Sequence, residues 1–298
     1  MKILLTGSSG FLGKHLFSYL NQEYDIYTLS RTHSSINCDL SVLQPTLPIV
    51  DIVIHSAGMA HILPKNNYEE NAFFKVNVKG TQNLLNALDL AVPKPRFFIF
   101  ISSVAVYGLN CGENINEDYP LLANDSYGKS KIETERLVND WCVKNGIICT
   151  ILRLPLLVGT NPKGNLGAMI KAIKNSYYFN IAGGHAKKSM VLATDVSKFI
   201  LKASEIGGIY NLTDGYNPSF YELSIFIAKQ LGKKSIHNMP YAVAKCIAFI
   251  GNGLGTYFPM NTTKMDKITS TLTFDDSKAR VAFGWNPKPI LKEFKIYE

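Results

Sequence analysis

The stretch Thr6-Gly7-Ser8-Ser9-Gly10-Phe11-Leu12-Gly13 decides the fold, because a predicted strand precedes it and a predicted helix follows it. Residues 2–6 are apolar and β-prone, and Leu12, Leu16 and Leu20 recur every four residues, as on one face of a helix. Glycines at this spacing allow a tight turn, close approach of backbone to a pyrophosphate and close packing of helix on strand. The stretch therefore indicates a dinucleotide-binding turn, with a plain glycine-rich turn as the alternative.

Beyond this turn, the first half of the chain alternates short apolar runs with helical patterns. Strands are predicted at 24–29, 51–55, 97–101 and 147–152, and helices near 73–90 and 126–144. Apolar strands separated by helices imply a parallel sheet that is covered on both faces. Residues 1–160 are therefore expected to form a Rossmann-like, doubly wound α/β domain.

The pattern changes after Pro155, where Gly, Asn and Pro cluster over 159–167 and indicate a loop. Helices are predicted near 166–174, 195–204, 221–231 and 241–250. A length of 298 residues suits roughly two structural units. We therefore expect a smaller C-terminal α/β lobe for the substrate over 161–298, with 191–203 returning to the first domain.

Composition excludes several classes of protein. With 46% hydrophobic and 18% charged residues, the chain is a globular protein and not a disordered one. The formal charge of +8 is scattered, unlike the dense basic stripe of nucleic-acid binders, so we expect a small anionic ligand and no nucleic acid. The five cysteines form no C-x-x-C pair and the six histidines no H-x-x-x-H pair, which favours a reduced, cytoplasmic protein with no metal site.

The longest apolar stretch, 241–254, is interrupted by Lys245 and by Gly251-Asn252-Gly253. It is too short to span a bilayer. A packed helix is expected there, with contact at a membrane surface as the alternative. Near the start of the chain, Gly7 follows too soon after Met1 for a signal peptide.

The end of the second predicted strand bears on the choice of cofactor. NAD enzymes place an acidic residue there to hold the ribose hydroxyls, whereas this chain has Ser30 and Arg31. A guanidinium suits a 2′-phosphate, so NADP is predicted, with NAD possible and Arg31 as a solvated surface charge the alternative. Further along, Asp39 and Leu40 are candidates for the adenine, and Asp39 is equally suited to cap a helix.

Tyr127 and Lys131 are the first candidates for catalysis. They are four residues apart on a predicted helix and so share one face. An adjacent ammonium is expected to lower the pKa of the tyrosine from ~10 towards the range useful for acid–base catalysis. An amphipathic surface pair is the alternative.

Two further polar positions lie where catalytic groups are expected. Ser102 and Ser103 end the fourth predicted strand, and ligands of open α/β sheets bind at the carboxyl ends of strands. Asn77 lies in mid-helix, where helix propensity does not favour asparagine. Each has a structural alternative, namely capping of the strand end or local backbone hydrogen bonding.

Together these motifs resemble the extended short-chain dehydrogenase/reductase family. The matching segments are T-G-S-S-G-F-L-G at 6–13, H-S-A-G at 55–58, N-V-K-G-T at 77–81, S-S-V-A-V-Y-G at 102–108, Y-G-K-S-K at 127–131, L-R-L-P-L-L-V-G at 152–159 and F-G-W-N-P at 283–287. The resemblance implies a catalytic triad of Ser103, Tyr127 and Lys131, supported by Asn77. The implied cofactor contacts are Gly7, Ser9, Gly10, Phe11, Leu12, Gly13, Ser30, Arg31, Asp39, Leu40, Ala57, Gly58, Tyr127, Lys131 and Pro155.

The resemblance also limits the range of reactions that we expect the enzyme to catalyse. Extended members act mostly on nucleotide sugars, and here Ser103, Asn165, Leu166 and Lys188 occupy substrate positions, with Lys188 where relatives often carry arginine. Val104-Ala105 replaces the Asp-Glu pair of sugar-nucleotide dehydratases, which argues against dehydration.

The chain is most similar to bacterial UDP-sugar 4-epimerases and 4-reductases. We therefore expect reduction of a 4-keto UDP-sugar, with Tyr127 as the proton donor. A 4-epimerase with tightly bound NAD is the main alternative; a reductase of hydrophobic ketones and a non-enzymatic NADP sensor are the others. The resemblance further implies a homodimer formed through a four-helix contact.

Overall fold

The computed structural model describes residues 1–60, 64–160, 162, 164–254 and 261–296. A central sheet of seven parallel strands has the order β11-β7-β5-β4-β1-β2-β3. The strand order reverses between β1 and β4, so a crevice is expected at the carboxyl ends of these strands. The strands are β1 (Lys2–Thr6), β2 (Asp25–Ser30), β3 (Ile36–Asn37), β4 (Ile52–His55), β5 (Phe97–Ser103), β7 (Ile148–Leu154) and β11 (Gly208–Asn211).

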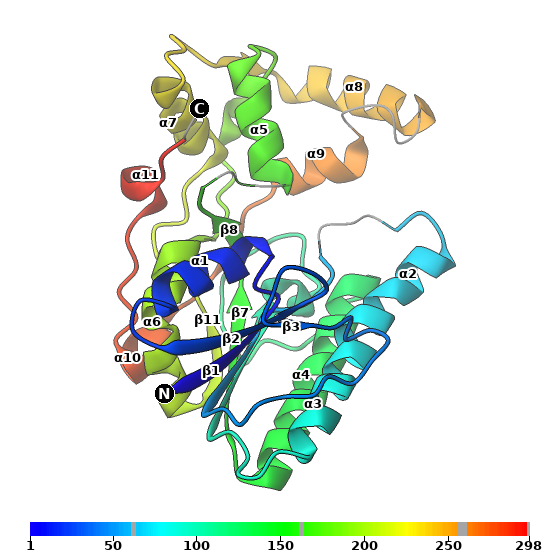
Figure 1. Cartoon of the computed structure of the whole chain (residues 1–298). Helices are drawn as coiled ribbons and strands as arrows, with labels where there is room; N and C mark the ends of the chain where they lie inside the picture. The colour runs from blue at the N-terminus through cyan, green and yellow to red at the C-terminus, as the bar shows by residue number, and fades with distance from the viewer. Residues whose placement is uncertain (61–63, 161, 163, 255–260, 297–298) are drawn as a thin grey trace.

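Helices cover both faces of this sheet (Figure 1). On one face lie α1 (Phe11–Leu20), α6 (Ala193–Ile206) and α10 (Ser277–Phe283), packed on Ile3, Leu5 and Ile54. On the other lie α3 (Gly80–Asp89) and α4 (Ser126–Asn145), packed on Leu4, Val53 and Phe98. Neighbouring strand residues thus point to opposite sides, and both sides are apolar, which explains the unbroken hydrophobic runs in the sequence.

The predicted doubly wound α/β fold is confirmed, with differences in detail. The sheet gains β3 and β11, which are too short to show a clear hydrophobic pattern. The predicted helix over 73–90 divides into a π-helical turn (Phe74–Lys79) and α3, and a further helix that was not predicted, α2 (Asn67–Phe73), precedes them. The segment expected to return to the sheet also divides. Its start, β10 (Met190–Leu192), pairs with β8 (Leu156–Val158) in a separate two-stranded sheet, whereas α6 packs on α1.

The C-terminal lobe has its own hydrophobic core, in which α5 (Gly164–Lys174) and α7 (Phe220–Gln230) pack on β8, β10 and α11 (Ile290–Glu293). A hairpin of helices, α8 (Tyr241–Leu254) and α9 (Thr262–Thr269), extends from it. The remaining elements are short. They are β6 (Gly112–Ile115) with β13 (Leu272–Phe274), β9 (Phe179–Ile181) with β12 (His237–Met239), and the 3₁₀ turns Val104–Tyr107 and Ala182–Gly184.

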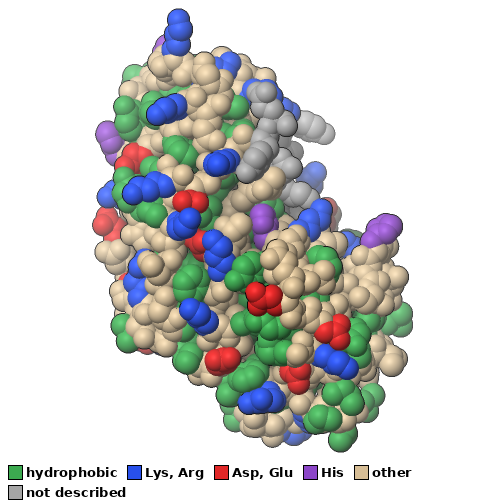
Figure 2. All heavy atoms as spheres, turned by 60° about the vertical axis from the view of Figure 1, so that its left-hand side comes forward, with side chains coloured by type: hydrophobic (Ala, Val, Ile, Leu, Met, Phe, Trp, Pro, Cys, Tyr) green, Lys and Arg blue, Asp and Glu red, His purple; other side chains and the backbone are tan. Residues whose placement is uncertain are grey.

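Three observations concern the described residues as a whole. None of their helices is both long enough and apolar enough to cross a bilayer. On the face that Figure 2 shows, lysines and arginines lie singly among tan, green and red side chains instead of forming one stripe. Within the ranges described, no cluster of His, Cys, Asp and Glu has the arrangement of a metal site.

Candidate active site

The glycine-rich turn after β1 is held so tightly that side chains would not fit. Gly7 has a positive φ of 71°, and a Cβ there would lie 2.6 Å from the backbone nitrogen of Ala57. A Cβ on Gly13 would lie 2.1 Å from the carbonyl oxygen of Gly7. Between them, exposed Ser9 and Gly10 precede the first turn of α1, which Phe11 and Leu12 begin. The backbone is therefore open at the helix N-terminus, as a bound pyrophosphate requires.

A buried chain of hydrogen bonds connects this turn to the next strand and to α3. The hydroxyl of Thr81 donates to the carbonyl oxygen of Asn77 (2.6 Å), so it must accept from His55 Nε2 (2.8 Å). Burial lowers the pKa of His55 to about 3 and keeps the ring neutral, so Nδ1 accepts from the hydroxyl of Thr6 (2.7 Å). The Thr6 oxygen in turn accepts from the N–H of Ala57 (3.1 Å). This chain fixes the strand ends on which the cofactor contacts are predicted.

The end of β2 carries the predicted adenosine contacts. The buried Ser30 hydroxyl donates to the carbonyl oxygen of Thr32 (2.7 Å), and Arg31 is exposed beside it. A hydrogen bond from Ser41 lowers the pKa of Asp39, and the charges of Arg31 and Lys75 lower it further. Lys75, from the π-helical turn, thus joins this end of the site. Lys75 was not predicted from the sequence, because no local pattern relates residue 75 to residue 31.

Leu40 anchors the same loop on α3. It is 8% exposed, and its carbonyl oxygen accepts from the side chain of Asn83 on α3 (2.7 Å). Its backbone and Cβ also lie against Gly80. The side chain of Leu40 therefore belongs to the core, and Asp39 is the half-buried member of the pair.

The two serines at the end of β5 have different partners. Ser102 is buried and donates to Glu135 Oε1 on α4 (2.5 Å). Ser103 forms a side-chain hydrogen bond with Tyr127, and its oxygen also accepts from the N–H of Ala105 (3.2 Å). Phe73 packs against the ring of Tyr127, with centroids 6.0 Å apart. Ser103 and Tyr127 therefore form a hydroxyl pair beside an apolar wall.

Tyr127 differs from the expectation in its acidity. Burial raises its pKa, and the charge of Asp125 raises it further, while the hydrogen bond from Ser103 opposes both. The expectation that the Lys131 ammonium lowers this pKa is wrong for this structure, because the ammonium donates to the carbonyl oxygen of Ile101 (2.7 Å) and lies over the ring of Phe100. Tyr127 is therefore a protonated phenol at neutral pH.

Lys131 lies at the centre of a second group of predicted residues. Burial lowers its pKa to about 8, and the nearby Glu135 carboxylate opposes that shift. A Cβ on Gly58 would lie 3.8 Å from Lys131 Nζ and 3.2 Å from Asn77 Oδ1. The structure thus brings Lys131, Asn77 and the 55–58 segment together at the carboxyl edge of the sheet.

Asn77 forms a clamp in this group. Its Oδ1 accepts from the N–H of Met59 (2.7 Å), and its Nδ2 donates to the Met59 carbonyl oxygen (3.2 Å) and to Ser130 Oγ (2.9 Å). Ser130 lies between Tyr127 and Lys131 on α4. Asn77 therefore ties the segment after β4 to α4, from a π-helical turn of the kind common at functional sites.

The predicted substrate residues lie in the C-terminal lobe, apart from Ser103. Asn165 is exposed in the first turn of α5. Leu166 is 2% exposed and its side chain packs in the core of the lobe, and its predicted contact with the substrate stays a prediction. Burial lowers the pKa of Lys188 to about 8, the charge of Lys267 adds to that shift and Cys111 opposes it. Pro155 joins β7 to β8, at the junction between the domains.

Comparison with known proteins places these features in a family. The model of the NAD dependent epimerase/dehydratase family matches residues 3–213. N-acetyl-alpha-D-glucosaminyl-diphospho-ditrans,octacis-undecaprenol 4-epimerase of Escherichia coli O157:H7 is 27% identical over 294 residues, which are 93% of this chain and 88% of the relative. GDP-6-deoxy-D-mannose reductase of Pseudomonas aeruginosa is 28% identical over 246 residues, covering 76% of this chain and 79% of the relative.

Solved structures agree with the fold. RMD from Pseudomonas aeruginosa, complexed with NADPH, superposes with a TM-score of 0.75 at 21% identity, covering 98% of this chain and 96% of that one. The relatives are sugar epimerases and reductases that share the dinucleotide-binding fold. The residues of the glycine-rich turn fit a dinucleotide, and the family match spans both this turn and Tyr127. The chain therefore belongs to the NAD dependent epimerase/dehydratase family, enzymes of the extended short-chain dehydrogenase/reductase type that use NAD or NADP.

Proposed function

We propose that this enzyme reduces the 4-keto group of a UDP-sugar with NADPH. The observation that carries the proposal is the end of β2, where Ser30-Arg31 replaces the carboxylate that favours NAD. Arg31 is exposed and able to pair with a 2′-phosphate, and Lys75 adds a second positive charge near Asp39. An exchangeable NADPH suits a reductase, which must take up new hydride in every turnover.

The acid–base groups support the same direction of reaction. A bound nicotinamide supplies the hydride. Ser103 holds the carbonyl oxygen of the substrate, and Tyr127 donates the proton that completes the alcohol. Because burial keeps Tyr127 protonated, its ground state is the proton donor that reduction needs. Lys131, whose pKa is lowered to about 8, carries positive charge at neutral pH and suits the ribose hydroxyls.

The cofactor preference is testable by exchanging the residues that set it. The wild type is expected to bind NADPH more tightly than NADH, and Ser30→Asp with Arg31→Ala is expected to reverse that order. One charge-assisted contact at an exposed site corresponds to about 5–30-fold in affinity. Fluorescence titration of both cofactors, on protein stripped of nucleotide, measures the two constants. Arg96→Ala, at an exposed arginine before β5, is the control and is expected to change neither constant. Equal affinities in the wild type would contradict the proposal.

A 4-epimerase is the second candidate, because the relative from Escherichia coli is named a 4-epimerase. An epimerase returns the hydride to its own substrate and so keeps its NAD. Mass spectrometry of the nucleotide that copurifies with the enzyme separates the two candidates. Tightly retained NAD would favour epimerisation, and a protein that is free of nucleotide or holds exchangeable NADP would favour reduction.

We propose further that the C-terminal lobe binds the sugar nucleotide and that Lys188 contacts its diphosphate. Lys188→Ala is expected to weaken UDP binding by about 1.5–3 kcal/mol and to leave NADPH binding unchanged.

Since the pKa of Lys188 is lowered to about 8, UDP affinity in the wild type should fall as the pH rises through that value. Lys188→Arg should remove this pH dependence. Calorimetry measures both effects, with the exposed neighbour Lys187→Ala as the control; unchanged affinity in Lys188→Ala would place Lys188 outside the site.

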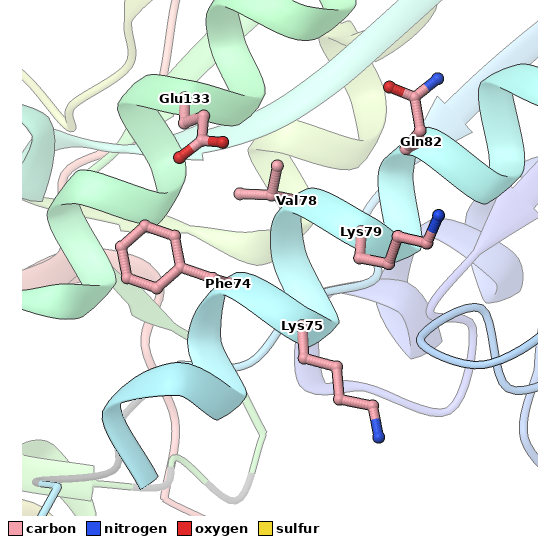
Figure 3. Close-up of a pocket in the computed structure, with 6 residues that line it drawn as sticks. All are labelled: Phe74, Lys75, Val78, Lys79, Gln82 and Glu133. Carbon is pink, nitrogen blue, oxygen red and sulfur yellow. The ribbon is translucent and has the colours of Figure 1, made fainter. Parts of the chain in front are cut away.

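The homodimer is proposed at the outer face of α4 and the π-helical turn before α3. A shallow groove of about 490 Å³ runs there, lined by Phe74, Lys75, Val78, Lys79, Gln82 and Glu133 (Figure 3). Apolar Phe74 and Val78 at its centre, with lysines on one side and Glu133 on the other, suit pairing with a second copy of the same face. Light scattering of the purified enzyme tests this, since the mass of a monomer would contradict it.

A further inference from the structure

Helix α8 exposes and buries the opposite kinds of side chain from those of an ordinary surface helix. Its large apolar side chains point outward, with Val243, Phe249 and Ile250 exposed by 48%, 75% and 58%. Its buried side consists of small residues, since Ala244 and Ala248 are exposed by 1% and 0%. A surface helix of a globular protein buries its large apolar residues and exposes polar ones. The apolar composition of the outward face of α8 is therefore typical of a surface that contacts another apolar surface.

Among the described residues, α8 is held on the protein by its small residues and by hydrogen bonds between Asn252 and Thr262 at the start of α9. Ala244 and Ala248 contact a minor cluster that includes Ile181 of β9 and Met265 of α9. In Figure 1, α8 lies at the upper edge of the molecule, beyond α5, with α9 beneath it. The exposed apolar residues are thus not needed to hold the helix in the fold. An outward cluster of this kind marks an interaction surface.

The charges around α8 indicate what the surface contacts. Helices α8 and α9, which pack on each other, contain three lysines and a single acidic residue, Asp266, so together they carry a surplus of two positive charges. One of these lysines, Lys245, is exposed on α8 one helical turn before Phe249. Apolar side chains beside lysines fit a layer of anionic headgroups above acyl chains.

The same charges argue against a second copy of the chain. In a two-fold interface a surface faces itself, so the lysines around α8 would meet their own counterparts with one aspartate per chain to offset them. The length of α8 also fits a bilayer surface. Its 14 residues extend about 21 Å, too short to span the hydrocarbon layer and suited to lie along it.

We propose that the outward face of α8 docks on the surface of an anionic lipid bilayer, with Phe249 and Ile250 inserted at the level of the headgroups and Lys245 paired with lipid phosphate. This docking is independent of the reaction that the active site performs, and it would bring the enzyme to a membrane surface without a bilayer-spanning helix among its described residues.

Flotation with lipid vesicles tests the proposal on the whole enzyme. The wild type is expected to float with vesicles of phosphatidylcholine and phosphatidylglycerol in equal parts, and less with phosphatidylcholine alone. Phe249→Ser with Ile250→Ser should weaken the partitioning by at least about tenfold, since two apolar side chains lose their burial. Lys245→Glu should weaken it by about tenfold on the anionic vesicles only. The controls are Val281→Ser and Lys144→Glu, which alter an apolar and a basic residue exposed on α10 and α4.

The outcomes of these measurements distinguish a lipid bilayer from a second protein chain as the partner of the outward face of α8. A wild type that stays unbound to anionic vesicles, or α8 variants that float as well as the controls, would overturn the proposal. A change in mass by light scattering in the Phe249→Ser and Ile250→Ser variant, without vesicle binding in the wild type, would assign the face to a second copy. Turnover of a soluble substrate by the α8 variants confirms that they are folded and keeps this test separate from that of the proposed reaction.

Discussion

Replacing Tyr127 with phenylalanine is expected to lower kcat by about 10²–10⁴-fold, because the phenol is the proposed proton donor and positioned acid–base catalysis contributes that much. The ring stays in place against Phe73, so the fold and the affinity for NADPH should hardly change. The loss should appear in kcat and to a similar extent in kcat/KM, as for a group that acts in the transition state. Steady-state kinetics with a 4-keto UDP-sugar, together with NADPH titration, measure these quantities.

Two further variants make this test specific. Ser103→Ala removes the hydroxyl that bonds to Tyr127 and should also lower kcat, with less effect than loss of the phenol itself. Tyr177→Phe, at an exposed tyrosine in the other lobe, should leave kcat unchanged. A Tyr127→Phe enzyme with more than about a tenth of the wild-type kcat would show that another group donates the proton.

Much of the fold was predictable because its signals are local. The glycine-rich turn lies within eight residues, and each long strand is an apolar run bounded by turns. Short elements such as β3 and β11 contain too few residues for a pattern, and their places in the sheet depend on neighbours far along the chain. The sequence therefore predicted the α/β class and the central strands, and missed the edge strands.

The site was predictable to the extent that its residues share one element. Tyr127 and Lys131 are related by helical spacing, and spacing alone suggested that the ammonium acts on the phenol. The actual partner of the ammonium, the carbonyl oxygen of Ile101, lies 30 residues earlier on β5. Burial of Tyr127 likewise results from packing on Phe73 of another helix. Electrostatic environment is a property of tertiary contacts, so the pKa of Tyr127 was not predictable from the sequence.

A buried ion pair that the sequence did not reveal lies behind the end of β5. Arg153 of β7 and Glu135 of α4 are 3% and 4% exposed. The guanidinium donates to both carboxylate oxygens, through Nε (3.1 Å) and Nη2 (2.8 Å), and Ser102 donates to the same carboxylate. Nη1 also donates to the hydroxyl of Tyr107 (3.1 Å). The pair therefore fixes β5, β7 and α4 directly behind Ser103 and Lys131.

Arg153→Met is expected to lower the free energy of unfolding by about 3–5 kcal/mol, since it leaves the Glu135 carboxylate buried without its counter-ion. Arg153→Met combined with Glu135→Leu should recover most of that loss, because the double variant removes both charges. Equilibrium unfolding in urea measures the differences, and exposed Arg96→Met should stay within about 0.5 kcal/mol of the wild type. A double variant no more stable than Arg153→Met would mean that lost packing, and not the unpaired charge, accounts for the effect.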